Sequence, residues 1–365
     1  MFAVILAGGA GTRLRPLTYA RRKELVPIVD RPLLEYRLTD LRDHGVRDIV
    51  LACAQGTQEI ERHFGAGASL DVRISYVYEE RPLGSGRAVK EAARAAGATG
   101  TLVVCNGDIL TNLDLTSMLG SHRETGATMS MSLAPVDDPW NFGVVSVDGD
   151  MRITSFIEKP PQGEQPSNLI NAGTWIFEPE VLARIPDDDS AVRDQFAERV
   201  LFPQLIADGR RLQGFVEDLW VDIGSPDRYL RANRLVLERL CAELATSPVA
   251  AQSAHIDRTA TFDGEVYVGA GAHVVARATV LGPTVVGSGA TVAAGARVEC
   301  SVLWEAAHVG PGAVVQGSII GAGARIGERA TVSGAVIADG AEVAAGHELP
   351  AGARLLPDDR APAAS

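Results

Sequence analysis

The sequence contains few cysteines and no long hydrophobic run. Its four cysteines, Cys53, Cys105, Cys241 and Cys300, form no Cys-x-x-Cys pair, which argues against a disulfide framework and against a zinc site of the usual spacing. No apolar run reaches the length of a transmembrane helix. The apolar start has no basic region ahead of it and leads directly into glycines, so we expect no signal peptide and a reducing, cytoplasmic environment.

Lysine is also scarce. Of the 34 basic side chains, only Lys23, Lys90 and Lys159 are lysines. A compact, rotatable ammonium group differs from a planar guanidinium at a crowded phosphate, so the positions of these lysines are informative. The net charge of −12 and the pI of about 5.1 argue against nucleic acid as a partner, since nucleic-acid binding needs a basic surface. Small anionic substrates stay compatible with this charge.

The first 230 residues alternate between strand and helix patterns. We expect strands at 3–6, 48–52, 73–78, 101–105, 127–133, 143–147 and 174–177, and helices at 33–44, 57–64 and 86–96. This alternation predicts an α/β domain with a mostly parallel sheet. Ligands of such a sheet bind at the carboxyl ends of its strands.

A six-residue repeat begins near residue 264. Aliphatic residues recur at Val268, Val274, Val280, Val286, Val292 and Val298, and after a shift of four residues at Val302, Val314, Ile320, Ile326 and Val332. Such a repeat predicts a parallel β-helix with stacked inward side chains. The expected organisation is therefore a domain at 1–230, a connecting helix and irregular linker at 231–263, a β-helix at 264–349 and a disordered tail at 350–365.

A glycine-rich turn follows the first expected strand. It contains Leu6, Gly8, Gly9, Gly11, Arg13 and Arg15. Glycines allow close approach of the backbone, whose N–H groups bind phosphate together with arginine side chains. The turn is not a P-loop, because no lysine follows at the required spacing, and it is not a dinucleotide fingerprint, because Leu14 stands where the third glycine belongs.

Further motifs lie at the ends of later expected strands. They are Glu79 to Ala88, Val104 to Asp108, Phe142-Gly143, Phe156 to Pro160, Asn171-Ala172-Gly173 and Trp220 to Pro226. Together with the glycine turn and Arg21-Arg22-Lys23-Glu24, these motifs resemble the sugar-1-phosphate nucleotidyltransferase family. In that family a Rossmann-like domain joins a nucleoside triphosphate to a sugar 1-phosphate and releases pyrophosphate. The hexapeptide segment resembles the left-handed β-helix that follows this domain in many members.

The resemblance implies a role for each matching residue. Nucleotide binding would fall to Leu6, Gly8, Gly9, Gly11, Glu79, Gly84 and Gly107. Arg13 would contact the leaving pyrophosphate and Lys23 the triphosphate, while Asp108 and Asp222 would bind Mg²⁺. Binding of the sugar phosphate would fall to Gly143, Glu158, Lys159 and Asn171. Glu24 stands where the family has proline, and we expect its side chain to point to solvent.

The choice of substrate has two candidates. The segments around Phe142, Asn171 and Trp304-Glu305 look most like mannose-1-phosphate guanylyltransferases, which implies GTP and mannose 1-phosphate. Glucose-1-phosphate thymidylyl- or uridylyltransferase is the alternative. We expect a homo-oligomer that forms through the β-helix, and neither nucleic acid nor a membrane as partner.

Two functions of another class also need tests. A non-catalytic regulatory subunit would have lost a metal aspartate or a phosphate lysine, which this chain keeps. Alternatively, the β-helix could transfer acyl groups through His273, His308 or His347, although a histidine on a coil turn is more often simply exposed.

Overall fold

The computed structural model describes residues 1–9, 11–192 and 195–361, which form two compact units. One unit contains residues 1–9 and 34–222, and the other contains residues 11–33 together with 223–361. The expected division at residue 230 is therefore incomplete. Residues 11–33 interrupt the α/β unit in sequence but make their contacts with the C-terminal unit.

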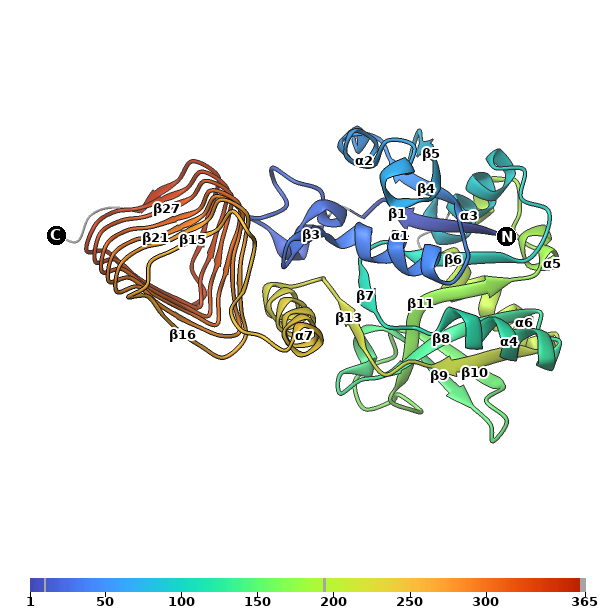
Figure 1. Cartoon of the computed structure of the whole chain (residues 1–365). Helices are drawn as coiled ribbons and strands as arrows, with labels where there is room; N and C mark the ends of the chain where they lie inside the picture. The colour runs from blue at the N-terminus through green and yellow to red at the C-terminus, as the bar shows by residue number, and fades with distance from the viewer. Residues whose placement is uncertain (10, 193–194, 362–365) are drawn as a thin grey trace. The chain divides into compact units, whose positions relative to one another are not determined.

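A nine-stranded sheet forms the centre of the α/β unit. Its strands are β1 (Phe2–Ala7), β4 (Asp48–Ala54), β5 (Arg73–Glu79), β6 (Leu102–Asn106), β8 (Met129–Pro135), β9 (Gly143–Val147), β10 (Ile153–Glu158), β11 (Leu169–Phe177) and β12 (Leu212–Val216). The order is β10-β9-β11-β6-β1-β4-β5, and β8 pairs with both β11 and β12. Figure 1 shows these strands between the helices of the unit.

The sheet is mixed, not mostly parallel. β6, β1, β4 and β5 are parallel neighbours, as expected for a Rossmann-like core. β11 runs antiparallel to β6 and β8, and β9 forms an antiparallel pair with β10. Only residues 148–152 separate β9 from β10, and a connection this short cannot cross over between parallel strands.

Helices cover this sheet. They are α1 (Leu33–Asp43), α2 (Gln58–Phe64), α3 (Gly84–Ala95), α4 (Leu115–Thr125), α5 (Pro179–Ala183) and α6 (Phe202–Ala207). The Asp114 side chain caps α4 by accepting from the Ser117 backbone N–H at 2.9 Å, which satisfies an otherwise unpaired donor of the first turn. The core contains Trp175, whose ring lies 5.2 Å edge-to-face from that of Phe202, an arrangement that aromatic pairs prefer.

The C-terminal unit contains one long helix and a β-helix. α7 (Pro226–Leu244) begins with Ser225 as its cap. The β-helix has three parallel sheets. Their strands are β14 (Val249–Ala250), β15 (His255–Ile256), β16 (Thr261–Asp263), β17 (Val266–Val268), β18 (His273–Val274), β19 (Thr279–Leu281), β20 (Thr284–Val286), β21 (Thr291–Val292), β22 (Arg297–Glu299), β23 (Val302–Leu303), β24 (His308–Val309), β25 (Val314–Gln316), β26 (Ile319–Ile320), β27 (Arg325–Ile326), β28 (Thr331–Ser333), β29 (Val336–Ile337), β30 (Glu342–Val343), β31 (Glu348–Leu349), β32 (Arg354–Leu355) and β33 (Arg360–Ala361).

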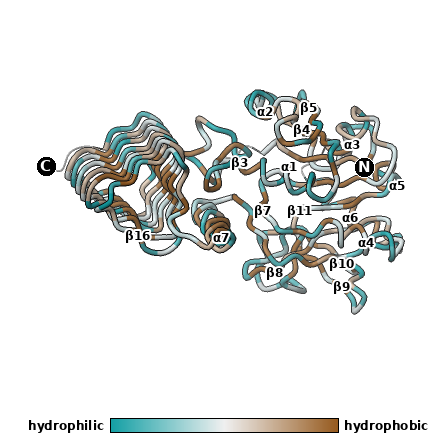
Figure 2. The backbone as a smooth tube through the Cα atoms, viewed as in Figure 1, coloured by the Kyte–Doolittle hydropathy of each residue, from teal (hydrophilic) through white to brown (hydrophobic). Residues whose placement is uncertain are grey.

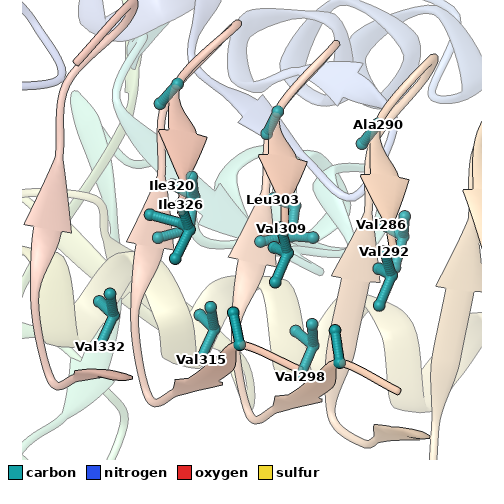
Figure 3. Close-up of a cluster of buried hydrophobic side chains, with 14 of the residues drawn as sticks. Val286, Ala290, Val292, Val298, Leu303, Val309, Val315, Ile320, Ile326 and Val332 are labelled. Carbon is teal, nitrogen blue, oxygen red and sulfur yellow. The ribbon is translucent and has the colours of Figure 1, made fainter. Parts of the chain in front are cut away.

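Aliphatic side chains fill the β-helix. Figure 3 shows columns of them that stack from coil to coil, including Val286, Leu303 and Ile320, and Figure 2 shows hydrophobic residues returning in successive coils. The hexapeptide prediction is therefore confirmed, and the three-sheet arrangement is consistent with a left-handed β-helix.

The four-residue shift in the repeat has a structural cause. Val280 pairs with Val298, a coil of 18 residues, whereas Val298 pairs with Val315 in a coil of 17. The omitted residue lies at a corner where Cys300 takes a positive φ of 47°. The inward residues after the shift are Leu303 and Val315, both fully buried, and the expectation that Val302 and Val314 point inward is wrong.

The β-helix extends beyond both of its expected ends, at residues 264 and 349. The expected linker at 246–263 contains β14, β15 and β16, which form the first coil and pair with the next. The expected tail contains β32 and β33, and residues 362–365 lie outside the described residues. End coils have one exposed face, so they carry fewer inward aliphatics and the repeat fades there. Within the described residues, no helix combines the length and the apolar character that a membrane span needs.

Candidate active site

A short strand pair places Asp222 next to the segment that contains Asp108. β7 (Ile109–Thr111) pairs with β13 (Trp220–Asp222), and Asp222 lies opposite Ile109, the residue after Asp108. Asp222 is only 8% exposed. The pairing therefore brings the backbone at Asp222 next to the residue that follows Asp108, more than 100 positions earlier in the sequence.

The first and third motifs also meet in this unit. Leu6 of β1 lies opposite Asn106 of β6, and the Gly107 N–H donates to the Leu6 carbonyl at 2.9 Å. A Cβ at Gly107 would lie 3.0 Å from that oxygen, so the contact needs glycine. Gly8 and Gly9 are exposed at the end of β1, and a Cβ at Gly9 would meet nothing within 4 Å. Close approach of these two glycines to a nucleotide stays a prediction.

Gly11 and Lys23 lie together in the C-terminal unit. Gly11 has a φ of 59°, and a Cβ there would lie 3.3 Å from the Lys23 Cβ and 3.2 Å from the Thr18 Cγ2. The Thr18 hydroxyl donates to the Gly11 carbonyl at 2.8 Å. Lys23 is buried, and Arg13 is exposed on the neighbouring 3₁₀ turn Thr12–Leu14. Gly11 and Lys23 therefore share one local structure.

The expectation for Glu24 is wrong. Its side chain does not point to solvent, because the residue is only 2% exposed. It lies in the 3₁₀ turn Lys23–Leu25, which buries Glu24 together with Lys23.

The segment that contains Glu79, predicted to bind the nucleotide, borders a pocket of about 360 Å³. Glu79 ends β5, and its Oε2 accepts from the Leu83 N–H at 3.0 Å. Burial raises the pKa of Glu79, and the Leu83 N–H partly offsets this effect. Gly84 begins α3 with a φ of 73°. Glu79 and Leu83 both line the pocket, next to Val77 and Tyr78.

The residues after Gly84 have structural contacts. The Ser85 hydroxyl donates to Glu198 at 2.6 Å, and the Arg87 guanidinium donates to the Pro186 carbonyl at 2.9 Å. Lys90 lies 3.0 Å from Asp187. Lys90, the lysine outside the predicted phosphate contacts, therefore holds the 186–187 segment against α3.

The Glu-Lys-Pro motif lies at the end of β10 beside Gly143. Glu158 and Gly143 are direct partners in the sheet, and a Cβ at Gly143 would lie 2.8 Å from the Glu158 Oε2. Burial raises the pKa of Glu158, and the neighbouring Lys159 ammonium, at 3.6 Å, opposes this shift. The Gln195 amide donates to Glu158 at 2.8 Å. The Lys159 side chain is half exposed and is thus accessible to an anion.

Asn171 and Gly173 lie at an irregularity of β11. The Asn171 Oδ1 accepts from the Gly173 N–H at 3.1 Å and from the Trp175 indole at 2.8 Å. Gly173 has a φ of 82°, and a Cβ there would lie 2.6 Å from the Asn106 Nδ2 and 2.5 Å from the Ile109 Cδ1. The predicted sugar loop therefore packs against residues on either side of Asp108.

Trp220, which has no role among the residues predicted from the motifs, contacts both the Asn171 loop and Phe142. Its indole donates to the Ala172 carbonyl at 2.9 Å, and its ring lies 5.2 Å edge-to-face from Phe142. The Phe142 carbonyl in turn accepts from the Lys159 N–H at 2.9 Å. The position of Trp220 two residues before Asp222 is the signal that could have identified it.

We expect Gly173→Ala to damage both stability and the site. The substitution places a side chain at positive φ and within 2.6 Å of the Asn106 amide, so β11 or the Asp108 segment must move. Strain of this kind costs about 1–3 kcal/mol. Chemical denaturation should show this loss, whereas Gly149→Ala, where a Cβ meets nothing within 4 Å, should leave the unfolding free energy nearly unchanged. Equal effects of the two substitutions would contradict the packing argument.

The donor set suits a hard divalent cation. Asp108 and Asp222 offer carboxylate oxygens from adjacent segments, and Mg²⁺ takes one or two carboxylates and completes its shell with water and substrate phosphates. Among the described residues, no group of three or more His, Cys, Asp and Glu side chains could hold a metal by itself. Metal binding by Asp108 and Asp222 stays a prediction.

Comparison with known proteins extends over most of the chain. Residues 2–239 match the Nucleotidyl transferase family and residues 249–357 match the GMPPB C-terminal domain. A mannose-1-phosphate guanylyltransferase of Mycobacterium tuberculosis is 38% identical over 235 residues, 63% of either chain. The catalytic subunit beta of the Drosophila pseudoobscura pseudoobscura mannose-1-phosphate guanylyltransferase is 33% identical over 265 residues, 71% of this chain and 70% of its own.

Other relatives carry different names. A UTP–glucose-1-phosphate uridylyltransferase of Synechocystis is 37% identical over 253 residues, 66% of this chain and 64% of its own. The chain thus spans a little under two thirds of the length of the Mycobacterium and Synechocystis relatives. A Bacillus anthracis crystal structure assigned as a glucose-1-phosphate thymidylyltransferase has a TM-score of 0.58 and 22% identity over 64% of this chain and 95% of that one, which supports the fold. The chain belongs to the nucleotidyl transferase family, within its group of sugar-1-phosphate nucleotidyltransferases.

Proposed function

We propose that this protein joins a nucleoside triphosphate to a sugar 1-phosphate and that its substrates are GTP and mannose 1-phosphate. The observation that carries the reaction class is the β7–β13 pair, which sets Asp222 beside the Asp108 segment, next to the loop of Asn171 and Gly173. The choice of substrates is supported by the names of the Mycobacterium and Drosophila relatives and by the match to the GMPPB C-terminal domain.

Nucleotide binding is proposed for the glycine turn and the pocket at α3. Gly8, Gly9, Gly11 and Gly107, with Leu6, would hold the nucleotide through backbone groups, while Glu79 and Gly84 would border the base. Arg13 and Lys23 would hold the β- and γ-phosphates, because fixed cations stabilise the charge that develops on the leaving group.

Sugar phosphate binding is proposed for residues of β9, β10 and β11 and for Lys159, which follows β10. Glu158 would accept from sugar hydroxyl groups, beside Gly143, whose missing side chain leaves space for the carboxylate. Lys159 would bind the phosphate with an ammonium that is half exposed. Asn171 is held by two donors, so its loop presents a fixed shape to the sugar.

The reaction needs no protein nucleophile. A sugar 1-phosphate oxygen, which is already ionised, attacks the α-phosphorus of the triphosphate, and the bond from that phosphorus to the β-phosphate oxygen breaks as pyrophosphate leaves. Mg²⁺ bound by Asp108 and Asp222 would offset negative charge on the phosphates. The chain's own residues then orient two anions that would otherwise repel, which is the main contribution in phosphoryl transfer.

Pyrophosphate release from combinations of GTP, dTTP and UTP with mannose 1-phosphate and glucose 1-phosphate tests the proposal. We expect GTP with mannose 1-phosphate to give the largest kcat/KM. The alternative is glucose-1-phosphate thymidylyl- or uridylyltransferase activity, which the names of the Synechocystis relative and the Bacillus structure favour. Product from glucose 1-phosphate with dTTP or UTP, and none from mannose 1-phosphate with GTP, would establish the alternative.

The same assay addresses the other function classes. Absence of pyrophosphate with every pair would favour a regulatory subunit. Consumption of acetyl-CoA would favour acyl transfer by the β-helix. There, His255 and His273 stack with ring centroids 4.6 Å apart, and His308 lies on the same sheet. Use of Mg²⁺ in preference to other divalent ions, a cytoplasmic location and a homo-oligomer formed through the β-helix stay predictions.

A further inference from the structure

The segment that carries Arg13 and Lys23 is fastened to α7 and to the β-helix. Within the C-terminal unit, the Val29 N–H donates to the Asn233 Oδ1 of α7 at 2.7 Å. The Tyr267 hydroxyl of β17 donates to the Asp30 carboxylate at 3.1 Å. Near the other end of the β-helix, the Arg354 guanidinium donates to the Arg15 carbonyl at 2.6 Å. The segment 15–30 therefore forms hydrogen bonds with α7 and with more than one coil of the β-helix.

Trp304 is the largest of these anchors. Leu303, the residue before Trp304, pairs with Val286 in one adjacent coil and with Ile320 in the other. Gly287 and Gly321 follow these two residues and therefore occupy the position of Trp304 in the adjacent coils. A corner position that is glycine in the coil on either side thus carries an indole in this coil, and Trp304 is 1% exposed. Trp304 is not part of the internal aliphatic stack of the β-helix. Trp304 is therefore buried on the outer face of the β-helix and not in its interior.

A chain of hydrogen bonds runs from Trp304 to the segment. The Trp304 indole N–H donates to the Tyr229 hydroxyl oxygen at 2.8 Å, and the Tyr229 hydroxyl donates to the Pro27 carbonyl at 2.6 Å. Tyr229 is fully buried. Loss of the shared hydroxyl would leave the indole N–H and the Pro27 carbonyl without these partners, and buried polar groups that lose a partner carry a full desolvation cost.

Arg21 is held by the same corner. Its guanidinium lies 4.9 Å from the centre of the Trp304 ring, within the range of a cation–π interaction. It also forms an ion pair with Glu305, the next residue of the coil. Arg21 stands two residues before Lys23, and Pro27 four residues after it. Both flanks of the lysine are thus fixed by one corner of the β-helix and by α7.

We propose that Trp304, Glu305 and Tyr229 are positioning residues that set the conformation of the Lys23 segment for the triphosphate. This inference rests on the proposed function, since it assigns to the β-helix a part in nucleotide binding by that site. The β-helix then contributes to the affinity for one substrate only. Displacement of a substrate-binding group by about 1 Å can cost on the order of a hundredfold in rate, so small changes at this corner are measurable.

Steady-state kinetics of full-length variants test the proposal. We expect Tyr229→Phe to raise KM for the nucleoside triphosphate about tenfold and Trp304→Phe about fivefold, from buried hydrogen bonds. Glu305→Gln should raise it about threefold, as for an exposed ion pair. KM for the sugar 1-phosphate should be unchanged. The double variant Trp304→Phe/Tyr229→Phe should show less than the product of the single effects, because both residues share one hydrogen bond.

Glu299→Gln is the matched control, because Glu299 forms an Arg–Glu ion pair with Arg297 within strand β22, at 2.8 Å. We expect no change of either KM in this variant. Thermal melting checks that each variant is folded, and if Tyr229→Phe does not fold, Glu305→Gln and Trp304→Phe still decide the question. An active wild type with an unchanged triphosphate KM in these variants, or an equal rise of both KM values, would overturn the proposal. A wild type that releases no pyrophosphate from any substrate pair would instead refute the proposed function.

Discussion

Asp222→Asn is expected to lower kcat for pyrophosphate release by about a thousandfold or more. The amide keeps the size of the carboxylate and its place opposite Ile109, but it removes the negative charge that a divalent cation needs. Charge neutralisation by such an ion is worth several kcal/mol in the transition state, and each 1.36 kcal/mol is about tenfold in rate. Asp108→Asn should give a loss of the same order.

The measurement is kcat over a range of Mg²⁺ concentrations. Asp218→Asn serves as the control, since Asp218 is an exposed carboxylate four residues earlier, and we expect it to keep wild-type activity. Removal of metal with a chelator should abolish activity of the wild type, and added Mg²⁺ should restore it. Nearly unchanged kcat and metal dependence in Asp222→Asn would show that the reaction does not use this aspartate as a ligand.

Glu217→Gln is expected to change the pH dependence of stability by about 3 kcal/mol. Burial raises the pKa of Glu217 from 4.5 to about 7, while the Thr111 hydroxyl bond, the Arg37 charge and Ser132 lower it and Asp40 adds to the rise. The Thr111 hydroxyl donates to the Glu217 Oε2, and Thr111 lies opposite Trp220 in the β7–β13 pair. Glu217 therefore supports the strands that carry the aspartates.

The sign follows from the raised pKa. The folded protein holds the proton more tightly than the unfolded chain, so this group stabilises the fold fully below about pH 4.5. That contribution is lost as the pH rises through about 7. A shift of this size corresponds to about 3 kcal/mol. The wild type loses this contribution as the pH rises, whereas Glu217→Gln does not. The unfolding free energy of the variant minus that of the wild type should therefore increase by about that amount from roughly pH 5 to pH 8.

Urea denaturation at both pH values measures this difference. Glu164→Gln is a suitable control because Glu164 is an exposed carboxylate, and its effect should be the same at both pH values. If Glu217→Gln also gave a pH-independent difference, the carboxyl group would not change its protonation state on folding in this range.

Much of the candidate site was readable in the sequence because its motifs are short and stand at strand ends. Gly107, Asp108 and Glu158 lie where the motif order predicts, since a residue that ends a strand is placed by that strand. Glu24 and Trp220 were misread or overlooked. Whether a side chain at a turn is buried depends on what packs over it, and that neighbour comes from a distant part of the chain.

The structure of the β-helix could likewise be predicted from the sequence only in part. Its repeat of six was sufficient to predict stacked coils, because each coil repeats one local pattern. The 17-residue coils were not predicted, since a corner that omits one residue places the next inward side chain, Leu303, five positions after Val298 instead of six, while the composition stays the same. The first and last coils escaped the pattern because an end coil covers its neighbour on one side only.

The sequence by itself determined the two architectures, the family and the residues that are candidates for phosphate, sugar and metal, since each depends on periodicity or on a short motif. Only the tertiary structure decided that Asp222 lies beside the Asp108 segment through β7 and β13, and that the segment carrying Lys23 is held by Trp304 and Tyr229. These contacts join residues 75 to 202 positions apart. No local spacing specifies such pairs, because they form only when separately folded elements pack together.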